Sequence, residues 1–268
     1  MIIIVLFIIS LRPLIIKNDY SDNLKILFVI DNSLSMDAID SNGNNKLDNV
    51  KNDCTNIIDN FKTSHFSIIT FNNKAEIVIP FTNDIKTSKL ILDSIETPNI
   101  LYAKGSSLNT PIETIKENIK NEKIVLFYLS DGEITDNSKL ESYKILRKYI
   151  SDGAVISYGT KEGSNIKYFN NETSSDEYII DQDTGKPAIT KLDEKNLIKI
   201  SKDLKIDYIN SNNELNKKIK DIKRKSVILN KKNISNYYDI YYILTIPLLI
   251  LIIIELNSFR RKMLWKDY

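Results

Sequence analysis

The stretch Ile26-Leu-Phe-Val-Ile-Asp31-Asn-Ser33-Leu-Ser35-Met36 decides the fold. Its first five residues are all apolar, without the alternation of a strand that has one face in water. Such a run predicts a strand of a sheet that is covered by helices on both faces. An aspartate follows directly, and two serines follow the aspartate at alternate positions. We therefore expect a polar cluster at the carboxyl end of a buried strand.

Four further apolar runs predict strands of the same sheet: Phe66–Phe71, Ala75–Pro80, Ile124–Leu129 and Ala154–Tyr158. Apolar residues recur at spacings of three and four between them, which is the period of an amphipathic helix. These stripes are Leu47, Val50, Cys54, Ile57 and Phe61; Leu108, Ile112, Ile115 and Ile119; and Leu140, Tyr143, Leu146 and Tyr149. Alternating strands and helices predict an α/β fold with a doubly wound, mostly parallel sheet.

The segment after Tyr158 has a different pattern. Residues 177–180 and 186–190 flank Asp181-Gln-Asp-Thr-Gly185, which predicts a hairpin. Leu197, Ile200 and Leu204 then predict a helix, residues 208–209 a short strand, and Leu215, Ile219 and Ile222 a last helix.

The composition limits which disulfides and metal sites this chain can form. The chain has 268 residues and a net charge of +2, which gives no bias toward nucleic acid. It has one cysteine, Cys54, and one histidine, His65, so an intramolecular disulfide is excluded and an ordinary structural zinc site lacks ligands. A metal in this chain must be held mostly by oxygen, which favours hard cations.

Both ends of the chain are apolar. Residues 1–16 predict an N-terminal membrane anchor, although sixteen helical residues reach only about 24 Å. Residues 239–259 predict a transmembrane helix. After Asp239, its first residue, Glu255 is the only charged residue. The expected organisation is a folded domain over 23–222, a basic juxtamembrane linker over 223–238 and a basic tail over 260–268. Basic residues flank the span on both sides, so their distribution does not decide its orientation.

Three loops carry the candidate site. Asp31, Ser33 and Ser35 follow the first strand, Ser106 lies in the Lys104-Gly-Ser-Ser107 loop, and Asp131 lies in Ser130-Asp-Gly132 after another strand. Ligands in open α/β sheets bind beyond the carboxyl ends of the strands, where these loops would meet. Two carboxylates and three hydroxyls form a shell for Mg²⁺ or Mn²⁺, with Ca²⁺ as an alternative. Direct ligation by neutral hydroxyls would leave the ion electrophilic and ready to accept a partner's carboxylate.

These motifs resemble the metal-ion-dependent adhesion site of von Willebrand factor A-type domains. The resemblance implies direct metal ligation by Ser33, Ser35 and Ser106, while Asp31 and Asp131 act mainly through water. Ser106 stands in the place of the family's usual threonine, so it keeps the oxygen but lacks a methyl group that restricts the rotamer.

The chain also resembles the membrane-anchored Bat-type aerotolerance proteins of bacteria. The similarity rests on Ile9-Ser-Leu-Arg-Pro13, on Lys46-Leu-Asp-Asn-Val-Lys51 and on Gly185-Lys-Pro-Ala-Ile-Thr-Lys-Leu-Asp193. It implies a protein of the bacterial cell membrane with an extracytoplasmic domain. It also implies other Bat-type proteins and a MoxR-type AAA+ ATPase as partners, in envelope assembly or stress tolerance. Two features depart from the family: the first of its two usual membrane helices is missing or truncated, and Leu204-Lys-Ile206 replaces Thr-Gly-Gly.

The expected function is a metal-dependent protein-interaction module without catalytic activity. One alternative is a surface adhesin that grips an acidic residue through the same metal. A remote alternative is a phosphatase of the haloacid dehalogenase type, which needs a second carboxylate two residues after the first aspartate. Ser33 occupies that position.

Overall fold

The computed structural model describes residues 14–17, 23–40, 43–100, 105–170, 175–181, 184–210, 212–230, 236–239 and 241–264. The chain divides into two compact units, one formed by Ser21–Ile228 and one formed by Met1–Tyr20 with Leu229–Tyr268. Residues 1–13 of the predicted N-terminal anchor lie outside the described residues.

The larger unit is built on a sheet of six strands in the order β11-β6-β5-β2-β3-β4. These are β2 (Lys25–Asp31), β3 (His65–Phe71), β4 (Ala75–Thr82), β5 (Ile124–Ser130), β6 (Ile150–Ser157) and β11 (Asp207–Ile209). All neighbours are parallel except β3 and β4, which form an antiparallel pair at one edge. The predicted α/β fold with a mostly parallel sheet is thus confirmed.

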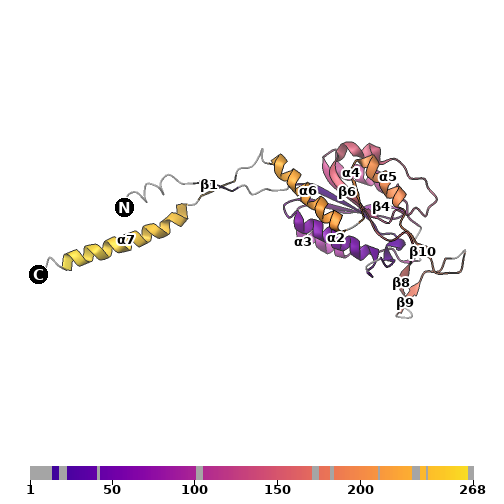
Figure 1. Ribbon diagram of the computed structural model, residues 1–268, viewed down its shortest axis with the longest axis horizontal. Helices are drawn as coiled ribbons and strands as arrows, with labels where there is room; N and C mark the ends of the chain where they lie inside the picture. The colour runs from indigo at the N-terminus through magenta and orange to yellow at the C-terminus, as the bar shows by residue number, and fades with distance from the viewer. Residues whose placement is uncertain are drawn as a thin grey trace. The chain divides into compact units, whose positions relative to one another are not determined.

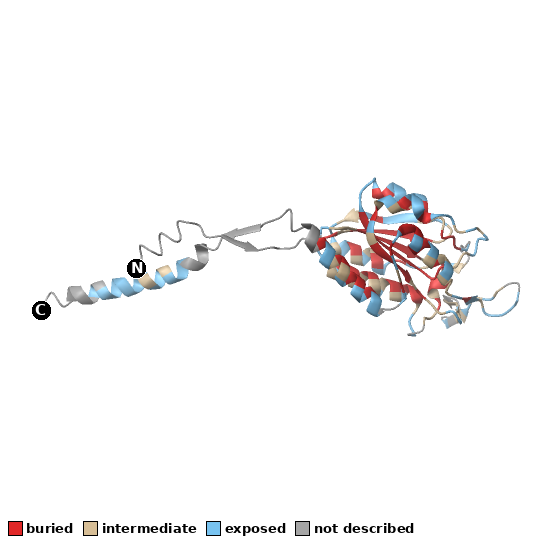
Figure 2. Ribbon diagram, turned by 45° about the horizontal axis from the view of Figure 1, so that its top comes forward, coloured by how far each residue is buried: buried red, intermediate tan, exposed pale blue. Residues whose placement is uncertain are grey.

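Helices cover both faces of this sheet (Figure 1). Helices α2 (Lys46–Asn60), α3 (Ile85–Asp93) and α6 (Asn212–Asn230) contribute to one apolar cluster with Ile26, Phe28 and Ile30 of β2. Helices α4 (Pro111–Ile119) and α5 (Glu194–Leu204) and the 3₁₀-helix η3 (Tyr143–Tyr149) form a second cluster with Leu27 and Val29. Alternate residues of one strand therefore fill two cores, and Figure 2 shows the strands as the buried centre of the unit. This explains the uninterrupted apolar run of the sequence.

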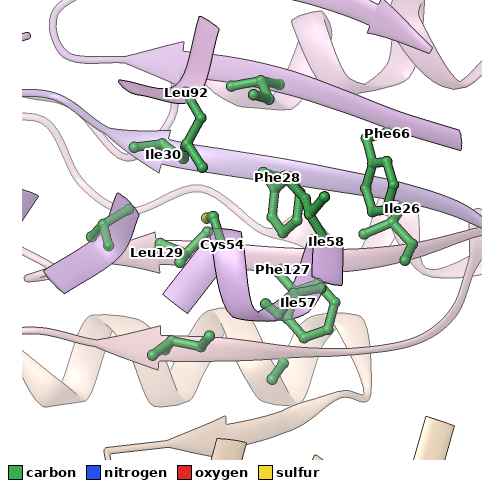
Figure 3. Packing of buried hydrophobic residues seen from close by; sticks show 14 of the residues in the cluster. Ile26, Phe28, Ile30, Cys54, Ile57, Ile58, Phe66, Leu92, Phe127 and Leu129 are labelled. Atoms are coloured by element: carbon green, nitrogen blue, oxygen red, sulfur yellow. The ribbon is translucent and has the colours of Figure 1, made fainter. Parts of the chain in front are cut away.

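The first core contains a row of aromatic rings (Figure 3). Phe28 stacks on Phe66 at 6.1 Å and on Phe127 at 6.0 Å between ring centroids, so one ring comes from each of three adjacent strands. Such stacked rings add to the free energy gained by burying their apolar area.

Two helical segments differ from the expectation. Helix α3 was not predicted, because its apolar stripe of Ile85, Ile91 and Leu92 is short and Ser88 interrupts it. Its start is stabilised by the Asp84 side chain, which accepts a hydrogen bond from the Thr87 amide at 3.1 Å. The stripe 140–149 forms the 3₁₀-helix η3 together with an irregular lead-in.

The segment after β6 is more divided than the sequence suggests. The predicted hairpin is short: Asp181 donates to the Lys186 carbonyl at 2.9 Å, and Ala188 donates to the Ile179 carbonyl at 2.7 Å. Its outer residues pair elsewhere, since β9 (Ser175–Tyr178) pairs with β8 (Lys167–Asn170) and β10 (Ile189–Thr190) pairs with β7 (Ser164–Asn165).

The smaller unit contains β1 (Leu14–Lys17), which pairs antiparallel with β12 (Asn236–Asp239), and the helix α7 (Tyr241–Leu264). Among the residues that the structure describes, no helix is long and apolar enough to cross a membrane. The transmembrane helices expected to flank the domain are therefore not confirmed. The described side chains of α7 include the exposed residues Ile246, Leu249, Ile250, Ile253, Ile254 and Leu256.

We predict that Phe28→Ala lowers the free energy of unfolding by about 3–5 kcal/mol, because it removes a fully buried ring and leaves a cavity between two others. Urea unfolding of the full-length protein measures the change. Leu90→Ala on α3 is the control, since Leu90 is 61% exposed, and it should shift stability by no more than about 0.5 kcal/mol. A loss below about 1 kcal/mol for Phe28→Ala would contradict this account of the core.

Candidate metal centre

The candidate site lies where the strand order of the sheet reverses. The chain runs from β2 through α2 to β3 on one side, and it returns later to β5 on the other side of β2. The carboxyl ends of β2 and β5 are Asp31 and Ser130, and these strands are parallel neighbours. Open α/β sheets bind ligands at such a switch point.

The first loop forms a compact turn at the end of β2. Asp31 Oδ1 accepts hydrogen bonds from the Ser33 amide at 3.0 Å and from the Ser33 hydroxyl at 2.6 Å. The hydroxyls of Ser33 and Ser35 lie 3.0 Å apart. Because the hydrogen of Ser33 points to Asp31, Ser35 donates to Ser33. The predicted Asp31, Ser33 and Ser35 are thus brought together, with their oxygens facing one another.

Two buried carboxylates face the same space. Asp31 and Asp131 are both fully buried, and the Ser130 hydroxyl donates to Asp31 Oδ2 at 2.7 Å. Burial, followed by the like charge of Asp131, raises the pKa of Asp31 to about 7 although three hydrogen bonds oppose the shift. A cation placed between the two carboxylates would relieve this repulsion.

Ser106 joins the cluster through Glu133. Its hydroxyl donates to the Glu133 carbonyl at 3.0 Å, and the Glu133 amide donates to Asp131 Oδ1 at 3.1 Å. The preceding Gly105 has φ +80°, and a Cβ there would lie 2.8 Å from the Thr135 hydroxyl. The structure thus brings the predicted Ser106 beside the Asp131 loop.

A lysine that the sequence analysis did not assign to the site lies inside it. Lys46 is fully buried, and its ammonium contacts Asp131 Oδ2 at 2.9 Å. Its position at the first residue of α2, directly after Asn45, was the one local hint in the sequence. A cation is unfavourable at a helix N-terminus and needs a nearby partner.

Thr190 connects the segment after the hairpin to the same cluster. Its hydroxyl lies 3.2 Å from Asp131 Oδ2, 3.1 Å from the Lys46 ammonium and 2.6 Å from Glu133 Oε2. Glu133 Oε1 also accepts from the Lys191 amide at 2.6 Å. Burial, followed by the charge of Asp131, raises the pKa of Glu133. Thr190 and Glu133 were also missed, because neither belongs to the motif at the strand ends.

The donor set fits a hard divalent cation. The residues Asp31, Ser33, Ser35, Ser106 and Asp131 offer oxygen alone, as Mg²⁺ and Mn²⁺ prefer. Within the described part of the chain, no group of three or more His, Cys, Asp or Glu side chains is arranged to hold a metal. A metal at this place would therefore depend on serine hydroxyls beside two carboxylates.

We predict that Thr190→Val destabilises the protein by about 1–3 kcal/mol, because the nearly isosteric valine removes one buried hydrogen-bond partner each from Asp131, Lys46 and Glu133. Thermal or urea unfolding in EDTA measures this loss. Thr184→Val is the control, since Thr184 is exposed, and it should cost no more than about 0.5 kcal/mol. Equal effects of the two substitutions would contradict the bridging role of Thr190.

Residues 26–133 match the family model of the von Willebrand factor type A domain. This range contains all three loops of the candidate site. No curated protein matches the chain.

Solved structures share the fold. The conserved hypothetical protein BatB of Bacteroides thetaiotaomicron is 24% identical, with a TM-score of 0.64 over 75% of this chain and 98% of that one. An aerotolerance-related membrane protein of Bacteroides fragilis is 22% identical, with a TM-score of 0.61 over 76% of this chain and 98% of the other.

A more distant structure was solved with a metal. Proximal thread matrix protein 1 of the mussel byssus, with a zinc-occupied metal-ion-dependent adhesion site, is 17% identical. Its TM-score is 0.50 over 80% of this chain and 48% of that one. Residues 26–133 are thus similar to a von Willebrand factor type A domain, and the chain shares its fold with the two Bacteroides structures.

Proposed function

We propose that this protein is a membrane-anchored interaction module that binds an acidic residue of a partner protein through a divalent cation. Von Willebrand factor A-type domains generally act as interaction modules, which supports the coarser part of this proposal. The observation that carries the finer part is the pair of buried carboxylates, Asp31 and Asp131, beside serine hydroxyls at the switch point of the sheet.

In this proposal Ser33, Ser35 and Ser106 ligate Mg²⁺ or Mn²⁺ directly, and the two aspartates act mainly through water. Ca²⁺ is the alternative ion. The hydroxyls are neutral, so the ion keeps an electrophilic position that a carboxylate from another protein can fill. The zinc-occupied site of the mussel byssus protein supports the idea that this fold can hold a cation at its metal-ion-dependent adhesion site.

We propose no catalytic role for the site. A phosphatase of the haloacid dehalogenase type needs a general acid two residues after its nucleophilic aspartate. Ser33 stands there instead, and its hydroxyl is hydrogen-bonded to Asp31 Oδ1 at 2.6 Å. The adhesin alternative uses the same metal and the same acidic ligand, but no observation favours it over an interaction at the membrane.

Attachment to the bacterial cell membrane, through the segments 239–259 and 1–16, is part of the proposal. The exposed apolar side chains of α7 and the membrane protein of Bacteroides fragilis support it. By resemblance we place the domain outside the cytoplasm and propose other Bat-type proteins and a MoxR-type ATPase as partners in envelope assembly or stress tolerance. In this arrangement, an acidic residue of the partner would bind the ion.

We predict that Mg²⁺ or Mn²⁺ raises the unfolding temperature of the full-length protein relative to EDTA. An ion at 100 times its dissociation constant stabilises the folded state by about 2.7 kcal/mol if it binds this state alone. Asp31→Asn should abolish the shift. This variant should still fold in EDTA, since it removes the repulsion between Asp31 and Asp131.

Asp59→Asn is the matched control, because Asp59 lies on the exposed face of α2 and contacts Lys89 at 2.8 Å. It should keep the full metal-dependent shift. A shift that survives in Asp31→Asn, or no shift in the unmodified protein, would overturn the metal-dependent part of the proposal.

We also predict that lysines of the domain react with a membrane-impermeant amine reagent on intact cells. Lys62, Lys120 and Lys195 are exposed and make suitable sites for peptide mapping. Labelling that requires cell lysis would place the domain in the cytoplasm and exclude the proposed orientation.

A further inference from the structure

Lys46 lies in an unusual position for a lysine. It is the first residue of α2, where the helix dipole disfavours a positive charge, and it is fully buried. A buried ammonium is costly unless it is paired and hydrogen-bonded. The surroundings of Lys46 therefore show what holds it there.

The side chain of Lys46 is enclosed by contacts with three other segments of the chain. Its ammonium contacts Asp131 Oδ2 at 2.9 Å and donates to the Thr190 hydroxyl at 3.1 Å. Its stem runs against Gly159, where a Cβ would lie 2.8 Å from Lys46 Cε and 3.1 Å from Nζ. Gly159 also has φ +92°, a conformation that side-chain-bearing residues rarely adopt. A Cβ at position 159 would force the end of the Lys46 side chain to shift.

This contact changes the charge that a metal would meet. Lys46 compensates Asp131, which leaves Asp31 as the buried carboxylate of the cluster without a cationic partner among the interactions described. Glu133 is half-buried, and its carboxylate contacts Thr190 and the Lys191 amide, so solvent screens part of its charge. A divalent ion beside Asp31, Asp131 and Lys46 would leave these groups with a net charge of +1.

We propose that Lys46 is a tethered cation that competes with the divalent metal for Asp131 and weakens metal binding by the domain on its own. This inference rests on the proposed metal site and deepens it. The ammonium holds Asp131 in place when no metal is bound. It repels a metal that arrives without an anion, and it attracts the carboxylate that a partner supplies. Lys46 thus makes the affinity for the metal higher when an acidic ligand is present.

The test compares Mn²⁺ affinity among variants of the full-length protein, measured from free Mn²⁺ by electron paramagnetic resonance. Lys46→Met removes the charge and keeps most of the volume. Lys46→Gln removes the charge and keeps a donor to Asp131. Both should bind Mn²⁺ about tenfold more tightly or better, because a unit charge within a few ångströms of a partly buried ion has an effect of this size or larger. Lys46→Arg retains the charge and should stay near the original affinity.

Lys218→Met is the matched control. Lys218 on α6 is also buried, and it contacts Asp152 at 2.5 Å and Asp207 at 2.7 Å. Among the described residues it has no hydrogen bond or ion pair to a residue of the metal centre. This variant should lose stability but keep its Mn²⁺ affinity within about twofold. It separates a general loss of stability from a local change of charge.

Equal or weaker Mn²⁺ binding by both Lys46→Met and Lys46→Gln, in a protein that still binds Mn²⁺ itself, would overturn the role of Lys46 and leave the metal site standing. Absence of Mn²⁺ binding in every variant would overturn the metal site and the role of Lys46 together. Unfolding curves in EDTA identify any variant that does not fold. If Lys46→Met fails to fold, Lys46→Gln alone decides, because it can keep the hydrogen bond to Asp131.

Discussion

The burial of β2 on both faces is the constraint on which the rest of the domain depends. Each side chain from Ile26 to Ile30 is inaccessible to solvent, and the strand then ends on a carboxylate that is equally buried. Asp31 cannot be solvated, so its oxygens must accept hydrogen bonds from the Ser33 amide, the Ser33 hydroxyl and the Ser130 hydroxyl. The polar cluster is therefore a consequence of how the strand is packed, and its geometry is set by the two apolar cores on either side.

The same burial makes the repulsion between the two carboxylates of the site strong. Asp131 adds a second carboxylate at the end of the neighbouring strand, and the repulsion contributes to a pKa of about 7 for Asp31. Lys46 compensates one of the two charges from within the fold. Replacing the buried pair of Lys46 and Asp131 with apolar residues would often leave stability unchanged or raise it, because burying two charges costs about as much free energy as their attraction returns. Under the proposed function, the retained charges serve metal binding.

The sequence was sufficient for the sheet, for most of its helices and for the three loops of the candidate site. Apolar runs without alternation identify β2 and β5, and residues such as Asp31 and Asp131 follow them directly. It was not sufficient for α3, whose apolar stripe is short and interrupted by Ser88 and whose start is held by a cap. Nor did it reveal Lys46, because a lysine at the start of a helix usually points to water, and burial depends on the distant Gly159 and Thr190. Contacts between segments that lie more than 100 residues apart leave no local pattern.

The segment that follows the hairpin ties the site to a packed helix. Asp193 donates from its amide to the Asp131 carbonyl at 2.9 Å, and it caps α5 by accepting from the Lys195 amide at 3.1 Å. Asn196 on α5 donates to the Gly132 carbonyl at 3.0 Å. The loop that holds Asp131 is thus fixed from its far side by a helix whose apolar face packs in the second core. For a partner that binds at this edge, the loop that carries Asp131 is already held in place. Little conformational entropy is then lost on association, and a single acidic contact can contribute more of its gross energy to affinity.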